Sequence, residues 1–322
     1  MLRFILRRLL QLAPVLLAIA TLNFLLLQVA PGDAADIIAG QSGHATPEFV
    51  AALRAEFGLD QPMWKQYLIY IGKLVTLDLG YSFQYQLPVW KLILERLPAT
   101  LLLMVPALFI AIGLGVAFGV MAARRRGGFV DAAVSVAALI VYATPVFWLG
   151  LMLIVLFSIQ LGWLPSGGMS DVRASNTGIA YALDVCRHLV LPVVTMALFY
   201  VAIYTRLMRA SMLEVYSLDF ITTARAKGVP EGAIAWRHAA RNALLPVVTL
   251  AGLQFGHLLG GSVLVETVFG WPGLGRLVFD SLLQRDLNLL LGILFVSSVV
   301  VVLANLAADL TYGLLDPRIV HK

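Results

Sequence analysis

The chain has 322 residues, of which 60% are hydrophobic and only 13% are charged. With a mean hydropathy of +0.89, this composition excludes a soluble globular protein and indicates a membrane protein. The formal net charge is +5, and Cys186 is the single cysteine, so no internal disulfide is possible and no redox chemistry is indicated.

Uncharged runs of roughly 18 residues or more are long enough to cross a bilayer as helices. Six such runs occur in the chain, and they predict six transmembrane helices. They are Leu9–Gly32, Leu97–Ala123, Ala132–Ser170, His188–Thr205, Asn242–Val265 and Leu287–Ala308. The third run is longer than one span, and the Leu161–Pro165 stretch is expected to end the helix inside it.

The distribution of basic residues predicts the orientation, because cytoplasmic segments are enriched in Lys and Arg. With the N-terminus inside, the inner segments hold 14 of the 23 Lys and Arg residues. Both termini are therefore expected in the cytoplasm, and the basic charge reflects topology, not nucleic-acid binding. The run after Arg3, Arg7 and Arg8 is too long for a signal peptide, so we interpret it as a retained first span.

The outer segment between the first two spans, about residues 31–96, is predicted to contain short helices. Thr46 before Pro47 and Glu48 is typical of a helix start, which predicts a helix over Pro47–Phe57. A second, amphipathic helix is predicted over Met63–Val75. Its aromatic side is compatible with a lid or docking surface for a delivery protein, but the pattern favours a helix lying at the headgroup level.

Two features inside the spans predict how the helices pack and bend. Ala111, Gly115 and Gly119 lie four residues apart, and small residues at this spacing let two helices approach closely in lipid. We expect packing at this face rather than a substrate groove. Pro145 predicts a kink in the third span, because neighbouring groups must satisfy the carbonyl that a proline leaves free.

The inner loop of about residues 210–245 is neither apolar nor loop-like in composition. A helix is predicted over Phe220–Lys227, ended by Gly228 and Pro230, and a second helix over Glu231–Leu245 is expected to end before Pro246 opens the fifth span. Charge alone is equally compatible with a solvated basic loop at the membrane surface.

The order of residues in this loop is more specific than its charge. Ala224–Gly228 (ARAKG) followed by Arg241–Pro246 (RNALLP) resembles the coupling loop of ATP-binding-cassette (ABC) importer permeases, most closely the dipeptide, oligopeptide and nickel branch. Asp78–Ser82 and Glu266–Gly275 resemble further motifs of this branch, so the resemblance covers nearly the whole chain. The general importer signature has Glu-Ala-Ala where Thr222, Thr223 and Ala224 stand here, a departure typical of the peptide branch.

The resemblance implies an all-α fold with one membrane domain and a coupling helix of about Leu218–Lys227. In the family this helix rests in a cleft of the ATPase. The residues implied to couple are Phe220, Ile221, Thr222, Ala224, Arg225, Ala226, Lys227 and Gly228. Phe220 and Ile221 are expected to supply apolar burial, Arg225 and Lys227 positive charge, and Gly228 a turn with a positive φ.

The fifth span supplies candidates for the translocation pathway, because polar groups in a glycine-rich span must face protein or water. These candidates are Gln254, His257, Gly260, Gly261 and Ser262. Their spacing covers a third to half of the helix surface, so at least one is equally compatible with a hydrogen bond to a neighbouring helix.

No catalytic or nucleotide-binding motif accompanies these spans. The chain has no P-loop, no HExxH and no GxSxG, and its five histidines are scattered over both sides of the membrane. A secondary transporter or a passive channel are the alternatives, but a secondary transporter usually carries ionisable residues at mid-membrane, and His257 is the one clear case here.

The resemblance thus implies a non-enzymatic permease subunit in the bacterial inner membrane that forms half of a pore by alternating access. The implied partners are a second related permease, two ATPases that bind ATP and Mg, and an outer or lipid-anchored binding protein. Short peptides are the expected cargo, with nickel and glutathione as open alternatives.

Overall fold

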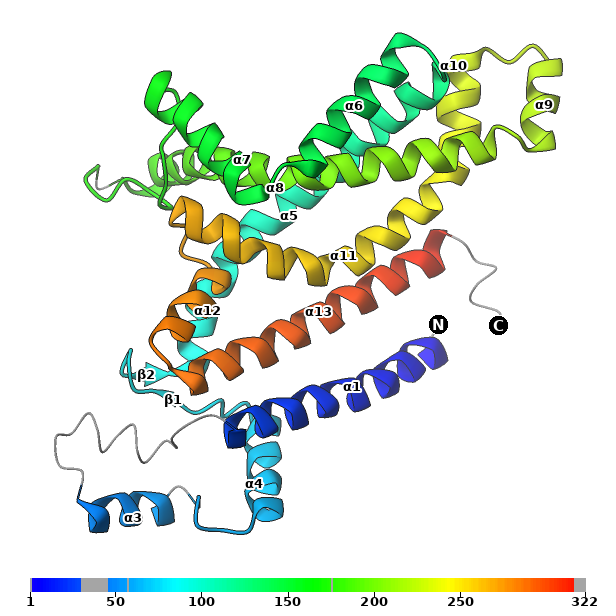
Figure 1. Cartoon of the computed structure of the whole chain (residues 1–322). Helices are drawn as coiled ribbons and strands as arrows, with labels where there is room; N and C mark the ends of the chain where they lie inside the picture. The colour runs from blue at the N-terminus through cyan, green and yellow to red at the C-terminus, as the bar shows by residue number, and fades with distance from the viewer. Residues whose placement is uncertain (1, 30–45, 57, 175, 316–322) are drawn as a thin grey trace. The chain divides into compact units, whose positions relative to one another are not determined.

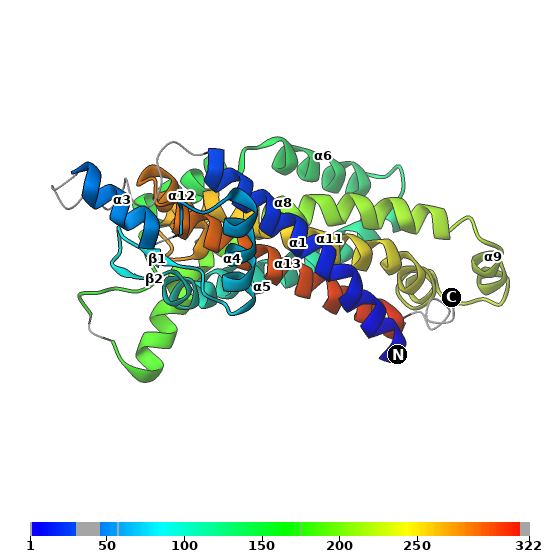
Figure 2. The ribbon, with the colours of Figure 1, turned by 90° about the horizontal axis from the view of Figure 1, so that it is seen from below.

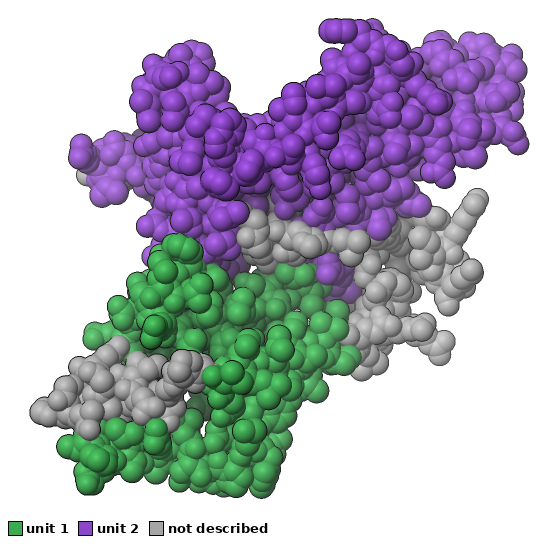
Figure 3. Space-filling model, viewed as in Figure 1, with its two compact units in different colours: residues 1–95, 278–303 green, residues 96–277, 304–322 purple. Residues whose placement is uncertain are grey.

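A computed structural model describes residues 2–29, 46–56, 58–174 and 176–315 (Figure 1). These residues form two compact units (Figure 3). Unit 1 comprises residues 1–95 and 278–303, and unit 2 comprises residues 96–277 and 304–322. Most of the described residues are helical, which agrees with the predicted fold class.

Unit 1 contains the first predicted span and the described part of the predicted outer insertion. Helix α1 covers Leu2–Val29, α3 covers Pro47–Glu56, and α4 covers Met63–Val75. The hydroxyl of Thr46 accepts a hydrogen bond from the Phe49 amide at 3.3 Å, as expected of an N-cap. The bounds of α4 are those predicted, whereas Phe57 and residues 31–45 lie outside the described residues.

The aromatic side of α4 packs mainly against α1. The ring centres of Tyr67 and Tyr70 lie 5.4 and 5.7 Å from that of Phe24, and the Tyr67 hydroxyl lies 2.8 Å from the Thr21 hydroxyl. Trp64, which shares this side in the sequence pattern, is 65% exposed. Two of the aromatic residues therefore join the helices of unit 1, and only Trp64 is free for another surface.

A small antiparallel hairpin that the sequence did not predict follows α4. Strands β1 (Tyr81–Ser82) and β2 (Leu87–Pro88) pair Tyr81 with Pro88 and Ser82 with Leu87. Strands of two residues are too short to leave an alternating pattern in the sequence. The hairpin is held by more distant parts of unit 1, since Asn288 donates a hydrogen bond to the Tyr81 carbonyl at 3.3 Å.

Unit 2 is built from helices of very different lengths. These are most of α5 (Val89–Arg124), which begins in unit 1, then α6 (Phe129–Ala143), α7 (Val146–Leu153), the π-helix η1 (Ile154–Gln160), α8 (Gly178–Val215), α9 (Asp219–Ala226), α10 (Glu231–Ala233), the π-helix η2 (Ile234–Ala239) and α11 (Ala240–Phe269). Helix α12 (Leu274–Leu283) and helix α13 (Leu287–Leu315) are each divided between the units.

Helices α5 and α8 are longer than the predicted spans Leu97–Ala123 and His188–Thr205. The uncharged-run criterion stops at the first charged residue, whereas a helix continues past the hydrocarbon layer where its backbone hydrogen bonds are still satisfied. Pro98 and Pro106 lie inside α5 without ending it.

The predicted kink at Pro145 is a full break. Helix α6 ends at Ala143, Thr144 is extended at φ −82° and ψ 128°, and the two halves of the broken pair meet at 102°. A residue before proline avoids the helical region, and proline itself cannot donate to the preceding turn, so the helix stops here instead of bending.

The predicted small-residue face of α5 packs closely on α8. A Cβ placed on Gly115 would lie 2.5 Å from the Cβ of Tyr204, and one on Gly119 would lie 2.6 Å from the Cβ of Met208. Ala111, on the same face, is fully buried. Only glycine fits at these two crossings, which confirms that this face serves packing.

Among the described residues, four helices are long and apolar enough to cross a membrane: α1, α5, α8 and α13. The count becomes five if the broken pair of α6 with α7 and η1 forms one span. The predicted fifth span, Asn242–Val265, lies in α11, which is helical throughout. Six spans, the sidedness of the termini and the insertion on the outer face remain predictions.

Candidate functional site

Helix α9 is a short helix at one end of unit 2. Its eight residues, Asp219–Ala226, follow Leu218, which is extended at φ −82° and ψ 147°. It carries an acidic residue in the first turn and a basic one in the last, as the helix dipole favours. Figures 1 and 2 both show α9 beyond the ends of α8 and α11. This position makes α9 a candidate surface for contact with another protein.

One side of α9 is buried against this chain. Ile221 is fully buried and Ala224 is 9% exposed, in the same core cluster as Ile234 and Ala235 of the segment that follows. The expectation that Ile221 offers apolar surface to a partner is therefore wrong for this structure, because its side chain already fills the core of unit 2. It acts instead as an anchor that holds α9 on its own fold.

The other side of α9 is open to contact. Phe220 is 41% exposed and Leu218 is 45% exposed, although both are large apolar residues. Trp236, on η2, is 46% exposed. The remaining exposed residues of the predicted coupling set are Thr222, Arg225, Ala226, Lys227 and Gly228. The surface thus combines apolar rings with positive charge, which suits a partner with an acidic, partly apolar cleft.

Arg225 is held in place by its own chain. Its Nε donates a hydrogen bond to Glu231 Oε1 at 2.8 Å, and its guanidinium carbon lies 5.7 Å from the centre of the Tyr216 ring. The hydrogen bond to Glu231 raises the pKa of Arg225 further above its ordinary value. Both side chains are about half exposed or more, so the pair adds little stability. Its main effect is to orient Arg225, which leaves Lys227 as the less constrained cation.

Gly228 has the positive φ that was predicted, at +76°. A Cβ placed there would meet no atom within 4 Å. Its amide donates to the Arg225 carbonyl at 2.9 Å, and the Val229 amide donates to the Ala224 carbonyl at 3.2 Å. Gly228 is thus required by the backbone conformation that ends α9 and not by lack of space.

The segment after α9 runs into α11 without a break. The expected stop before Pro246 is wrong, because α10, η2 and α11 follow one another directly and Pro246 lies inside α11. Pro246 is the seventh residue of α11, past the first turn, so the helix continues although proline cannot donate a backbone hydrogen bond there. A continuous helical path therefore connects the exposed loop to the helix that carries the pathway candidates.

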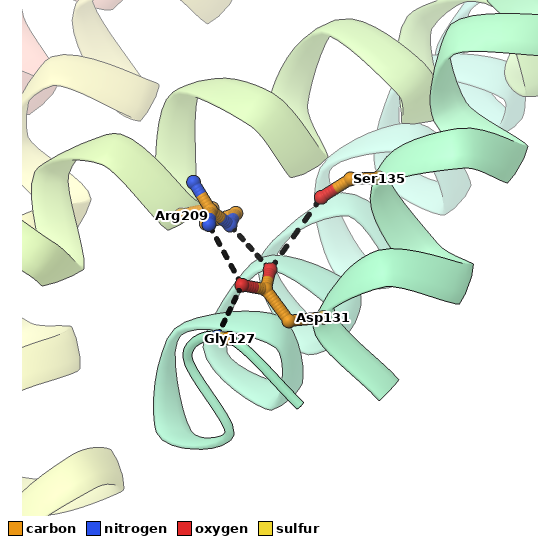
Figure 4. A network of polar contacts seen from close by, with 4 residues as sticks. All are labelled: Gly127, Asp131, Ser135 and Arg209. Carbon is orange, nitrogen blue, oxygen red and sulfur yellow. Dashed lines mark hydrogen bonds and ion pairs between the residues drawn. The ribbon is translucent and has the colours of Figure 1, made fainter. Parts of the chain in front are cut away.

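A partly buried ion pair joins α6 to α8 near the start of the loop (Figure 4). Arg209 of α8 donates from Nε to Asp131 Oδ1 at 2.6 Å and from a terminal nitrogen to Oδ2 at 2.8 Å. Asp131 is 5% exposed, and it also accepts from the Gly127 amide at 3.0 Å. This bidentate geometry fixes the start of α6 to α8 shortly before α8 reaches the loop. Sequence analysis missed the pair, although Asp131 and Arg209 are opposite charges next to predicted spans.

The pathway candidates all lie on α11, but the structure describes them unequally. Gln254 is partly exposed, whereas the burial of His257, Gly260 and Gly261 lies outside what the structure describes. Ser262 is fully buried and hydrogen-bonds to Glu266 one turn later. In this structure Ser262 therefore faces the interior of unit 2. Its contact with Glu266 lies within α11 and differs from the expected hydrogen bond to a neighbouring helix, which stays a prediction.

Glu266 is the centre of a buried corner that the sequence did not reveal. Its carboxylate accepts from the Thr100 hydroxyl at 2.8 Å and from the Arg276 amide at 2.9 Å. The Thr100 hydroxyl in turn accepts from the Leu274 amide at 2.7 Å. Since a Cβ on Gly273 would lie 2.3 Å from this carboxylate, only glycine fits there. The corner joins α5 to the consecutive helices α11 and α12, and Thr100 and Glu266 are 166 residues apart in the chain.

Two family profiles match the chain. The profile described as binding-protein-dependent transport system inner membrane component matches residues 115–321, and the profile for the N-terminal part of such membrane components matches residues 1–104.

Full-length relatives include the dipeptide transport system permease protein DppB of Escherichia coli (strain K12), 42% identical with 100% of both chains covered. The oligopeptide transport system permease protein AppB of Bacillus subtilis (strain 168) is 41% identical with 98% of both covered. Among solved structures, a chain of the MetNI methionine ABC transporter in an inward-facing conformation has a TM-score of 0.58 at 19% identity. The match covers 70% of this chain and 96% of that one, and it supports the fold.

Proposed function

Because the chain belongs to the family of binding-protein-dependent transport system inner membrane components, we propose that it is a permease of an ABC importer for short peptides. One observation carries the substrate: the likeness to a dipeptide permease and an oligopeptide permease extends over the full length of the chain. The family and the apolar helices together make it a multi-pass membrane protein. We place it in the bacterial inner membrane with both termini in the cytoplasm.

The proposed assembly contains partners that this chain needs for transport. It pairs with a second, related permease to form the pathway, and two ATPase subunits beneath it bind ATP and Mg. An outer binding protein delivers the cargo. The chain itself has no P-loop, so hydrolysis belongs to the partners and this subunit is not catalytic.

The geometry of α9 supports its role as the coupling helix. The exposed side, with Phe220 and Lys227, would enter the ATPase cleft, while Ile221 and Ala224 hold α9 to unit 2. A displacement of the ATPase would therefore be passed on through α10 and η2 into α11, because no break separates them. Rigid transmission of this kind is what alternating access requires.

In this mechanism α11 lines part of the pathway. Gln254, His257, Gly260 and Gly261 stay as candidate pathway residues on this helix, and Ser262 supports the buried corner instead. Cysteine substitutions at Gln254 and His257, in a background without Cys186, should react with a membrane-impermeant thiol reagent in an ATP-dependent manner. Absence of reaction in every nucleotide state would remove them from the pathway.

Growth of a deletion strain tests the substrate. The strain should fail to use di- and oligopeptides as an amino-acid source, and it should grow normally with limiting nickel or with glutathione as the sulfur source. A nickel or glutathione defect with normal peptide use would contradict the peptide assignment. Transport by the purified chain without any ATPase would instead indicate a secondary transporter.

A further inference from the structure

Unit 1 contains a pocket of about 650 Å³. It is lined by the last turns of α1, by α4, by the segment of residues 78–90 that carries the hairpin, and by residues 284–292 around the start of α13. These four segments are far apart in the sequence but belong to one compact unit. Neither the coupling surface around α9 nor the candidate pathway on α11 uses this pocket.

The wall of the pocket is largely apolar and is held rigidly. Phe24, Tyr70, Leu74 and Leu291 line it. Phe24 is 6% exposed and Leu74 is 7% exposed. The Tyr70 hydroxyl forms a hydrogen bond with the side chain of Asn23. Asn23 also donates to the Leu291 carbonyl at 3.4 Å, which joins α1 to α13 beside the pocket. An apolar chain entering here would find a preformed surface.

The lining of the pocket carries two basic side chains, Lys73 and Arg285, and two acidic ones, Asp78 and Asp286. Lys73 and Arg285 line it, and neither side chain makes a hydrogen bond or ion pair within the described part of the protein. The two acidic residues of the lining have local partners. Asp78 accepts from the Gly80 amide at 3.1 Å, while Asp286 accepts from the Leu289 amide at 3.1 Å and from the Ser82 hydroxyl. Next to the apolar wall, the two cations therefore have no side-chain partner among the described residues, whereas the two carboxylates already accept hydrogen bonds.

The position of the pocket along the membrane-spanning helices indicates which kind of molecule surrounds it. It is lined by the C-terminal end of α1 and the N-terminal end of α13, two helices long and apolar enough to cross a membrane. In the proposed topology these ends lie together at the outer boundary between lipid and water. At that depth an anionic phosphate lies directly above acyl chains, which is the arrangement of cations above apolar side chains seen here.

We propose that this pocket binds a phospholipid of the surrounding bilayer, with its phosphate at Lys73 and Arg285 and an acyl chain against Phe24, Tyr70 and Leu74. This inference rests on the proposed membrane topology but not on the transported substrate. A peptide is a poorer fit, because its ammonium group would have to share carboxylates that already accept hydrogen bonds, whereas Lys73 and Arg285 have no side-chain partner among the described residues. The bound lipid would fill the space between α1, α4 and α13 and stabilise unit 1.

The test compares the double variant Lys73→Gln/Arg285→Gln with the matched control Lys65→Gln. Lys65 lies on the same helix, does not line the pocket, and donates to Gln61 at 3.0 Å. Each full-length protein is purified in mild detergent, delipidated and titrated with phosphatidylglycerol, with bound lipid counted by native mass spectrometry. Wild type and Lys65→Gln should bind one tightly held lipid, and the double variant should bind it roughly tenfold more weakly or worse.

Three competition arms separate the possible ligands. Inorganic phosphate and a dipeptide should not displace the lipid, whereas a second phosphatidylglycerol of different chain length should. Equal lipid binding by wild type and double variant would overturn the proposal, as would the absence of any retained lipid in wild type. Displacement by phosphate would reassign the pocket to free anions, and displacement by the dipeptide would reassign it to substrate. The melting temperature of lipid-free protein should be the same for all three, which excludes misfolding as the cause of a loss.

Discussion

The turn at Gly228 is the most direct place to test whether α9 couples this chain to an ATPase. Its φ of +76° lies in the left-handed region, where a residue with a side chain costs about 1–2 kcal/mol and a β-branched residue more. Because a Cβ at Gly228 would meet nothing within 4 Å, the cost comes from the backbone alone. The effect of a substitution should therefore follow left-handed propensity and not side-chain size.

This reasoning predicts a graded series. Gly228→Asn should be close to wild type, Gly228→Ala intermediate, and Gly228→Val worst, because Asn tolerates the left-handed region best and valine least. When no ATPase is bound, the loop can relieve the strain by changing the turn at residue 228 and moving α9. Binding must then restore the original turn, and the cost of doing so weakens the affinity. The affinity for the ATPase subunit should then fall by up to about tenfold for a strain of about 1.4 kcal/mol.

Gly232 provides the matched control. It lies four residues further along the chain, has no positive φ, and a Cβ there would only approach the Arg124 guanidinium at 3.8 Å. Gly232→Ala should leave ATPase binding unchanged. The assay is capture of the purified ATPase by each variant, with peptide uptake per ATP hydrolysed measured in reconstituted vesicles. Wild-type capture and coupling by Gly228→Val, or an order that follows side-chain size, would refute the role assigned to this turn.

Three further predictions test the residues around this surface. Ile221→Ala should lower the stability of unit 2 by about 2–5 kcal/mol, seen as a lower melting temperature, because Ile221 is fully buried. Phe220→Ala should leave the melting temperature unchanged and weaken ATPase capture by about 1–3 kcal/mol. Equal melting temperatures of the two variants would contradict the assignment of Ile221 to the core and Phe220 to the contact surface. Asp131→Ala should destabilise the protein by about 1–3 kcal/mol. This is less than for a fully buried ion pair, because Arg209 is 32% exposed. A melting temperature equal to that of wild type would show that the pair does not contribute to stability. Thr100→Val should lower both the melting temperature and peptide uptake, because it removes two hydrogen bonds of the Glu266 corner. The control Thr267→Val removes only a local hydroxyl contact on α11, the helix that carries Glu266, and it should lower neither.

Several features of this protein were determined by the sequence alone because they depend on neighbouring residues. The bounds of α4, the N-cap at Thr46 and the left-handed turn at Gly228 all agree with the sequence predictions. Each depends on a few consecutive residues whose backbone preferences are local. The close packing at Gly115 and Gly119 was also readable, since four-residue spacing puts both on one helix face. The family could be recognised from the sequence for a related reason, because its motifs are short and follow one another in a fixed order along the chain.

Other features were decided only by the tertiary structure. Sequence periodicity cannot say that Ile221 faces its own core while Phe220 faces outward, because both are large apolar neighbours. Glu266 meets Thr100 across 166 residues of chain, and Arg209 meets Asp131 across 78. Lys73 and Arg285 come to one pocket from α4 and from the turn before α13. Such contacts depend on how helices pack after they form, and the energy that selects them is shared among residues that no local pattern connects.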